Sequence, residues 1–290
     1  MSEPFTETET IEVEARCLCR ANHCHIRGES FGIIYCHCRR CQKHHGSVAV
    51  PFVILKSAIV DWDQPPRLGH YQSELTERAF CETCGASFPR LPGGEVTGIG
   101  LPAGAITDMA PPLATWHLFT STMVSWYRVP EGVEASPGVG RGFEDQDPHL
   151  PELDRYVEPG KLTGSCLCGS VSYVAEPAER VMNCHCTRCR YSRGAAHATN
   201  VFVGRDRFAW RSGKDSVTHY RLPDAERFGV AFCRHCGSLV PRAGESRVSI
   251  PAGSLDVEPH IDPAGHIFTG SMARWHTIAD DLPQWQARPH

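Results

Sequence analysis

The sequence predicts a mainly β protein that consists of two tandem domains of the same kind. An ordered set of motifs occurs twice along the chain, and Cys17 to Trp126 spans the same 109 positions as Cys166 to Trp275. Short runs of β-branched and aromatic residues alternate with Gly, Pro and Asp. No stretch shows the apolar spacing of a helix of three turns, so we expect few and short helices.

The repeat also predicts where the domains begin and end. The first domain covers residues 12–130, a linker covers 131–160, and the second domain covers 161–285. The middle segment is rich in Pro, Gly and acidic residues without apolar periodicity, which favours a linker, although it could pack with the first domain. We expect the two repeats to form an intramolecular pseudo-dimer, because small domains of short strands leave apolar faces to cover.

The second repeat shows its expected elements most clearly. Its β-branched and aromatic runs predict strands at residues 171–174, 197–203, 217–222, 228–232 and 248–250. Short helical turns are expected after Cys189 and at residues 278–282, directly before Pro283.

Composition narrows the class of protein. Apolar residues make up 41% and charged residues 21%, as in soluble folded chains. No apolar run is long enough to cross a bilayer, and the N-terminus is acidic and polar, so we expect a cytoplasmic protein without membrane contact. A formal net charge of -4 offers no general attraction to nucleic acid, and none is expected as a partner.

Fifteen cysteines in such a chain indicate reduced thiols that bind metal rather than disulfides. In the second repeat two cysteines two positions apart leave the same face of an extended segment, and a C-x-x-C-G turn aims two more sulfurs at one point. Together these favour a closed four-cysteine zinc site, with buried thiols or a disulfide as the alternative. The two sets are Cys166, Cys168, Cys233 and Cys236, and Cys17, Cys19, Cys81 and Cys84.

The remaining motif, C-x-C-x-x-C, supplies three thiolates and leaves the fourth position of a zinc ion vacant, as in catalytic sites. It comprises Cys184, Cys186 and Cys189, and in the first repeat Cys36, Cys38 and Cys41. The alternative is a structural site closed by histidine. His44 or His45 could close the first triad, whereas the second repeat has Ser192 and Arg193 there.

Several residues near these motifs could have either of two roles. His37 and His185 stand between ligating cysteines and should point to the opposite face, supporting the site or facing solvent. His117 and His266 are expected in the core rather than in a pocket. Arg90 and Arg242 could each bind a carboxylate or remain solvated. Cys24 is left without a motif.

At these motifs the chain resembles the glutathione-dependent formaldehyde-activating enzyme family, also called the centromere protein V family, which has an Mss4-like β-tent fold. The second repeat carries the pattern most fully, as G-S-C-L-C-G, N-C-H-C-T-R-C-R, F-C-R-H-C-G and P-A-G-S-L-D. The first repeat resembles a diverged member, since Arg20 follows its second cysteine where the family usually has Gly.

The resemblance implies a structural zinc on the four-cysteine set of the second repeat and a catalytic zinc on Cys184, Cys186 and Cys189. It also implies a carbon–sulfur lyase or synthase that joins a small-molecule thiol, glutathione, to formaldehyde, giving S-hydroxymethylglutathione. An open zinc position suits this chemistry, because a thiol bound there loses its proton and can attack a carbonyl carbon. The alternative function is a non-catalytic, zinc-stabilised interaction module.

Overall fold

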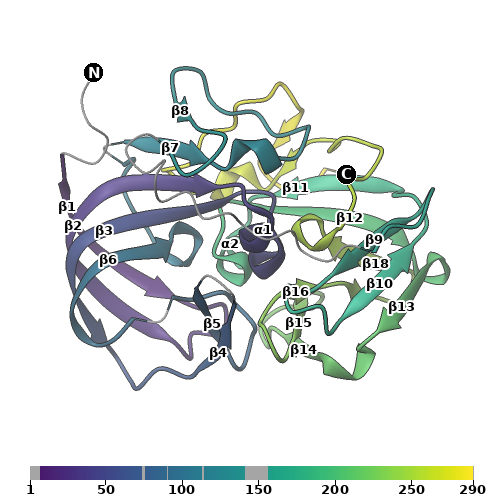
Figure 1. Ribbon diagram of the computed structural model, residues 1–290, viewed down its shortest axis with the longest axis horizontal. Coiled ribbons are helices and arrows are strands. Elements are labelled where there is room, and N and C mark those ends of the chain that lie inside the picture. Colours follow the sequence, from purple (N-terminus) through teal and green to yellow (C-terminus); the bar gives the residue numbers. More distant parts are fainter. Residues whose placement is uncertain (1–6, 74–75, 90, 113, 141–155, 290) are drawn as a thin grey trace.

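The computed structural model describes residues 7–73, 76–89, 91–112, 114–140 and 156–289. The fold is mainly β with few and short helices, as predicted, and its two halves are related by the sequence repeat (Figure 1). We refer to the half that contains residues 12–130 as copy one and to the half that contains residues 161–285 as copy two.

Copy one is built on one long, curved sheet with the order β6-β3-β2-β7-β8, and β1 pairs with β2. A separate hairpin, β4-β5, carries the C-x-x-C motif at its end. The elements are β1 (Glu9–Arg16), β2 (His23–Cys36), α1 (Arg39–His45), β3 (Val50–Trp62), β4 (Leu68–Gln72), β5 (Glu77–Cys81), β6 (Gly94–Pro102), η1 (Ala103–Ala105), β7 (Thr115–Leu118), η2 (Thr120–Thr122) and β8 (Glu134–Ala135).

Copy two divides the same strands between sheets ordered β17-β18-β12-β11-β19-β20, β13-β10-β9 and β14-β15-β16. The strands are β9 (Leu162–Ser165), β10 (Ser172–Ala175), β11 (Arg180–Cys184), β12 (Ala198–Gly204), β13 (Phe208–Ser212), β14 (Val217–Arg221), β15 (Gly229–Cys233), β16 (Leu239–Val240), β17 (Arg242–Ala243), β18 (Arg247–Pro251), β19 (His266–Ile267) and β20 (Gln284–Trp285). The helical elements are α2 (Thr187–Arg193), η4 (Arg205–Arg207), η5 (Lys214–Ser216), η6 (Ala252–Ser254) and η7 (Thr269–Ser271).

The long strands of copy one are broken in copy two for a local reason. Pro177 lies between β10 and β11, and proline cannot donate a hydrogen bond to a neighbouring strand. The turn η4 interrupts the strand that would otherwise join β12 to β13. The five strands expected in copy two are present within a residue or two of their predicted bounds.

The helix predictions were right in one place and wrong in two. The turn after Cys189 belongs to α2, as expected. Copy one has the equivalent helix α1, which was not predicted. Residues 278–282 are not helical, because the Asp280 carboxylate accepts the Leu282 backbone N–H at 3.0 Å and so competes with helical hydrogen bonding.

The two copies pack against each other through reciprocal contacts, with α1 and α2 side by side between them (Figure 1). A Cβ atom on Gly85 would lie 2.3 Å from the ring of Phe232, and one on Gly237 would lie 2.3 Å from the ring of Phe80. Both glycines have positive φ. These close approaches at equivalent positions show that the interface follows the symmetry of the repeat.

The segment that ends each repeat inserts into the other copy. Trp126 belongs to the core of copy two, beside Leu162 and Val201, whereas Trp275 belongs to the core of copy one. Each apolar core therefore includes side chains from both repeats. The pairing predicted from the duplication is seen in these contacts.

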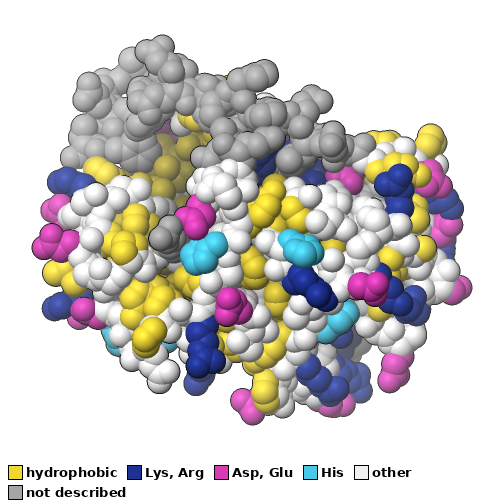
Figure 2. All heavy atoms as spheres, turned by 60° about the horizontal axis from the view of Figure 1, so that its bottom comes forward, with side chains coloured by type: hydrophobic (Ala, Val, Ile, Leu, Met, Phe, Trp, Pro, Cys, Tyr) yellow, Lys and Arg dark blue, Asp and Glu magenta, His cyan; other side chains and the backbone are white. Residues whose placement is uncertain are grey.

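Among the described residues, no helix is long and apolar enough to span a membrane. One face of the molecule shows cationic, anionic and hydrophobic side chains interspersed, without a large area of one charge (Figure 2).

Candidate metal centres

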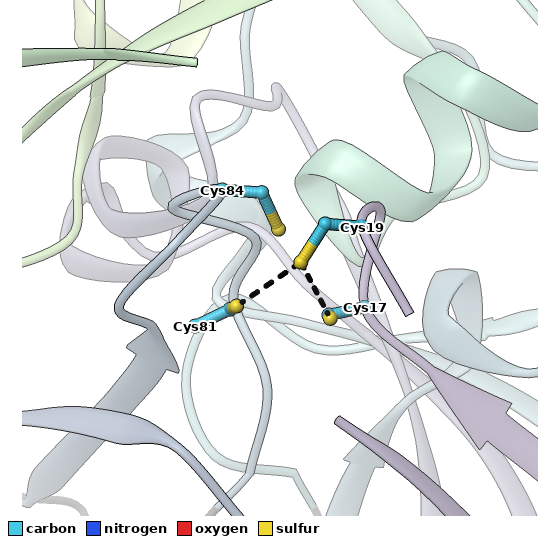
Figure 3. Close-up of side chains that lie close together, drawn as sticks. All are labelled: Cys17, Cys19, Cys81 and Cys84. Atoms are coloured by element: carbon cyan, nitrogen blue, oxygen red, sulfur yellow. Dashed lines mark hydrogen bonds between the residues drawn. The ribbon is translucent and has the colours of Figure 1, made fainter. Parts of the chain in front are cut away.

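Each predicted four-cysteine set converges on one point. In copy one the Sγ atoms of Cys17 and Cys19 are 3.5 Å apart, and those of Cys19 and Cys81 are 3.6 Å apart, with Cys84 completing the group (Figure 3). In copy two the matching set is Cys166, Cys168, Cys233 and Cys236. Within each set all four sulfurs lie within 4.8 Å of one another. Four thiols at this spacing suit tetrahedral zinc.

In each copy the C-x-x-C half of the set is formed by one tight turn. After β5 the Gly85 N–H donates to the Cys81 carbonyl at 2.8 Å, with Gly85 at φ 67°. After β15 the Gly237 N–H donates to the Cys233 carbonyl at 2.9 Å, with Gly237 at φ 70°. Such backbone is readily adopted by glycine alone, which explains the Gly that follows each C-x-x-C motif.

Each predicted triad also converges, at the point where a strand enters a short helix. The sulfurs of Cys36, Cys38 and Cys41 lie within 4.8 Å of one another, as do those of Cys184, Cys186 and Cys189. Cys38 and Cys186 are the N-cap residues of α1 and α2, and each sulfur accepts an N–H, from Cys41 and Cys189 respectively, at 3.4 Å. The helix start thus supplies donors that stabilise thiolates.

The acidities of the thiols differ between the triads. In copy one the pKa of Cys41 lies well below its ordinary value, because its thiolate accepts hydrogen bonds from Cys36 and Cys38. In copy two the pKa of Cys186 is the lowered one, through hydrogen bonds from Cys184 and Cys189. Each triad therefore holds one readily ionised thiol, and its two neighbours would release their protons on binding a metal.

The prediction that His44 or His45 closes the first triad is not supported by their positions. Neither imidazole belongs to the group of donors around Cys36, Cys38 and Cys41 in the described part of the chain. His44 Nδ1 donates to the Cys236 carbonyl at 3.1 Å, and His45 Nδ1 donates to the Arg193 carbonyl at 2.6 Å. Both imidazoles join the copies instead, so each triad offers three protein ligands.

The histidines between ligating cysteines do point to the opposite face, but they are fully buried rather than solvent-facing. His37 Nε2 lies 2.9 Å from His117 Nδ1, and His185 Nε2 lies 2.8 Å from His266 Nδ1. The second pair continues to Asp280, whose carboxylate is 3.0 Å from His266 Nε2. These pairs brace the loops that carry the triads.

Sequence reasoning missed Arg78, which lies beside the first triad. Both Nη atoms of Arg78 are 3.8 Å from Cys41 Sγ. The equivalent position in copy two is Val230, the second residue of β15 as Arg78 is of β5. Alignment of the copies would have revealed an arginine opposite a valine, but not that the guanidinium reaches the sulfur.

Both triads face pockets. Cys184 and Cys189 line a pocket of about 240 Å³ together with Arg193, Phe228 and Arg242. A second pocket of about 290 Å³ shares Arg242 and Phe202 with the first and is also lined by Arg180, Arg247 and Arg288. In copy one, Cys41 and Arg78 line a pocket of about 410 Å³. Arg242 therefore lies where an anionic ligand could meet it, while Arg90 is outside the described residues.

Cys24 contributes to none of these centres. It is fully buried between β1 and β3, and burial raises the pKa of its thiol to about 12. Cys24 is thus a protonated core side chain.

The fold and these sites define a tandem pair of cysteine-rich β domains, each with one four-thiol and one three-thiol cluster. The model of the family "glutathione-dependent formaldehyde-activating enzyme" matches residues 12–122 and 161–271, so the chain belongs to that family. No curated protein matches the chain. A crystal structure of a Rhodobacter sphaeroides protein is similar at 23% identity and a TM-score of 0.28, over 35% of this chain and 91% of that one.

Proposed function

We propose that the protein is a zinc-dependent carbon–sulfur lyase or synthase that acts on the adduct of a thiol and an aldehyde. The family's description supports glutathione as the thiol and formaldehyde as the aldehyde, which would give S-hydroxymethylglutathione. The observation that carries the proposal is that three thiols, not four, converge beside each pocket. A purely structural site would be expected to supply a fourth protein ligand.

The donor sets fit zinc. All fourteen sulfurs come from cysteines in two sets of four and two sets of three, and thiolates favour zinc over magnesium or calcium. The four-cysteine sets would hold structural zinc. Zinc on a triad would lower the pKa of a substrate thiol and stabilise its sulfur at the open position.

The residues of the copy two pocket suit an anionic thiol. Arg242 is available to attract a carboxylate, and the apolar side chains of Phe228 and Phe202 limit water near the sulfurs. In the synthetic direction the substrate sulfur attacks the carbonyl carbon, a carbon–sulfur bond forms, and the carbonyl oxygen takes up the proton released by the thiol. Cleavage reverses these steps.

Copy two is the better candidate for catalysis, through Cys184, Cys186 and Cys189. Neither His44 nor His45 is a donor to the first triad, so the choice between the copies follows from their pockets. In copy two an arginine-lined pocket continues from Arg242, whereas in copy one the guanidinium of Arg78 contacts Cys41 itself.

The test follows formaldehyde exchange with glutathione by NMR, after subtraction of the spontaneous reaction. Cys189→Ser should abolish protein-dependent exchange, whereas the matched variant Cys41→Ser should retain it. The opposite pattern would move the activity to copy one. No protein-dependent exchange with any thiol tested would favour the alternative, a zinc-stabilised interaction module.

A further inference from the structure

A cluster of two imidazoles and two carboxylates lies on the surface of the copy one sheet, and none of its members belongs to a cysteine set. His23 and His25 stand two apart on β2, so their side chains share one face of the strand. Glu14 on β1 is directly opposite His25 in the register. Asp63 follows β3, and its N–H donates to the His23 carbonyl at 3.2 Å. We call this group the outer histidine cluster.

Each imidazole of the outer histidine cluster lies between both carboxylates. His23 Nδ1 is 2.5 Å from Asp63 and His23 Nε2 is 3.5 Å from Glu14. His25 Nε2 is 3.5 Å from Asp63 and His25 Nδ1 is 3.9 Å from Glu14. The four side chains thus close a ring in which every ring nitrogen faces a carboxylate oxygen.

Neutral imidazoles cannot donate a hydrogen bond at every nitrogen–carboxylate contact of this ring. Each neutral imidazole carries one N–H, so two of the four nitrogens present lone pairs toward carboxylate oxygens. The ring has a formal charge of -2 from Glu14 and Asp63, while the nearby Asp61 is paired with Arg27. A cation between the side chains would turn this repulsion into attraction.

We propose that the outer histidine cluster is a divalent transition-metal site, separate from the cysteine centres, with His23, His25 and Glu14 as ligands and Asp63 as a fourth ligand or a support. One donor atom from each of the first three already lies within 4.8 Å of the others. Two imidazoles and carboxylates favour zinc, nickel or copper over magnesium or calcium.

Two features separate the site from the thiol chemistry. Cys24 lies between the two histidines in the chain but faces the core, so no thiol is offered to the ion. The equivalent stretch of copy two, Ser172, Tyr173 and Val174, has no imidazole. The site belongs to the segment in which copy one departs from the repeat.

The experiment measures the number of zinc ions bound per chain. Chains whose cysteine centres are loaded are dialysed against a zinc-buffered solution, and bound zinc per chain is measured for wild type and the variant His23→Gln/His25→Gln. His70→Gln is the matched control, because His70 is an exposed imidazole whose ion pair involves one carboxylate, Glu77. The double variant should lose one equivalent and the control should lose none.

Glu14→Gln provides a second variant that keeps both imidazoles. It should weaken the additional equivalent by at least about tenfold, the lower end of what loss of a supporting partner costs a metal site. Histidine side-chain NMR signals should shift with zinc in wild type and not in the double variant. Equal zinc content in wild type and both cluster variants would overturn the proposal. Formaldehyde exchange should be unchanged in these variants, so this test and that of the proposed lyase fail independently.

Discussion

Lys43→Met should destabilise the protein strongly, because Lys43 joins the two copies through a buried ion pair. Its Nζ lies 2.6 Å from Asp256 Oδ1 and donates to Ser165 Oγ at 2.9 Å. The side chains of Lys43 and Asp256 are only 2% and 1% exposed. The variant would leave the Asp256 carboxylate buried with the Ser165 hydroxyl at 3.3 Å as its remaining side-chain partner among the described residues.

The structure sets the size of this effect. At an effective dielectric constant of about 20, charges at this separation attract by roughly 6 kcal/mol, and part of that offsets the desolvation of both groups. Removing one member of a buried pair usually costs about 3–5 kcal/mol, which is our expectation for Lys43→Met. Lys43→Met/Asp256→Leu should recover much of the loss, because it leaves no unpaired charge.

Urea unfolding in zinc-containing buffer measures these free energies. Lys161→Met is the control, since Lys161 pairs with Glu176 at a half-exposed surface site and should lose at most about 1 kcal/mol. A loss below about 1 kcal/mol in Lys43→Met, or a double variant as unstable as the single one, would refute the reasoning.

Three further changes test the interface, the division between sites and the buried histidines. Gly237→Ala should cost about 2–4 kcal/mol in urea unfolding, because its methyl group meets an aromatic ring of copy one, whereas Gly169→Ala, with similar φ and open space, should cost about 1 kcal/mol. Cys236→Ser should unfold copy two and make the protein precipitate, whereas Cys186→Ser should mainly release a labile metal. Equal loss of solubility in the two variants would indicate that the triad is structural. Burial lowers the pKa of His117 to about 4. As the pH falls from about 6.5 to 4, the unfolded chain therefore binds a proton at His117 that the folded chain does not bind, and the free energy of unfolding decreases. His117→Phe should remove up to about 3 kcal/mol of that pH dependence, and an unchanged slope would contradict it.

The features that could be predicted from the sequence are those that depend on spacing along the chain. The duplication, the strands of copy two and the grouping of the cysteines all follow from order and distance along the chain. Helix α1 could also have been found, since Cys38 and Gly46 cap it as Cys186 and Gly194 cap α2. A repeat allows each copy to be used as a guide to the other.

What the sequence could not predict depends on contacts between the copies. His44 follows Cys41 by one helical turn, which made it a plausible ligand, but α1 packs on copy two and turns that imidazole toward the Cys236 carbonyl. Arg78 reaches Cys41 only because β5 and α1 meet beside one pocket. Such placements arise from tertiary packing, for which spacing carries no signal.

Cadmium NMR of the metal-substituted protein tests the central claim, that each copy holds one closed and one open thiolate centre. We expect two signals from the four-cysteine sets that do not change when glutathione is added. We expect the signals from the triads to shift as the substrate sulfur occupies the open position. Cys189→Ser should remove one of the responsive signals and leave both of the unresponsive ones. Four signals that are all insensitive to thiol would contradict the account, because they would show that every centre is closed by the protein itself.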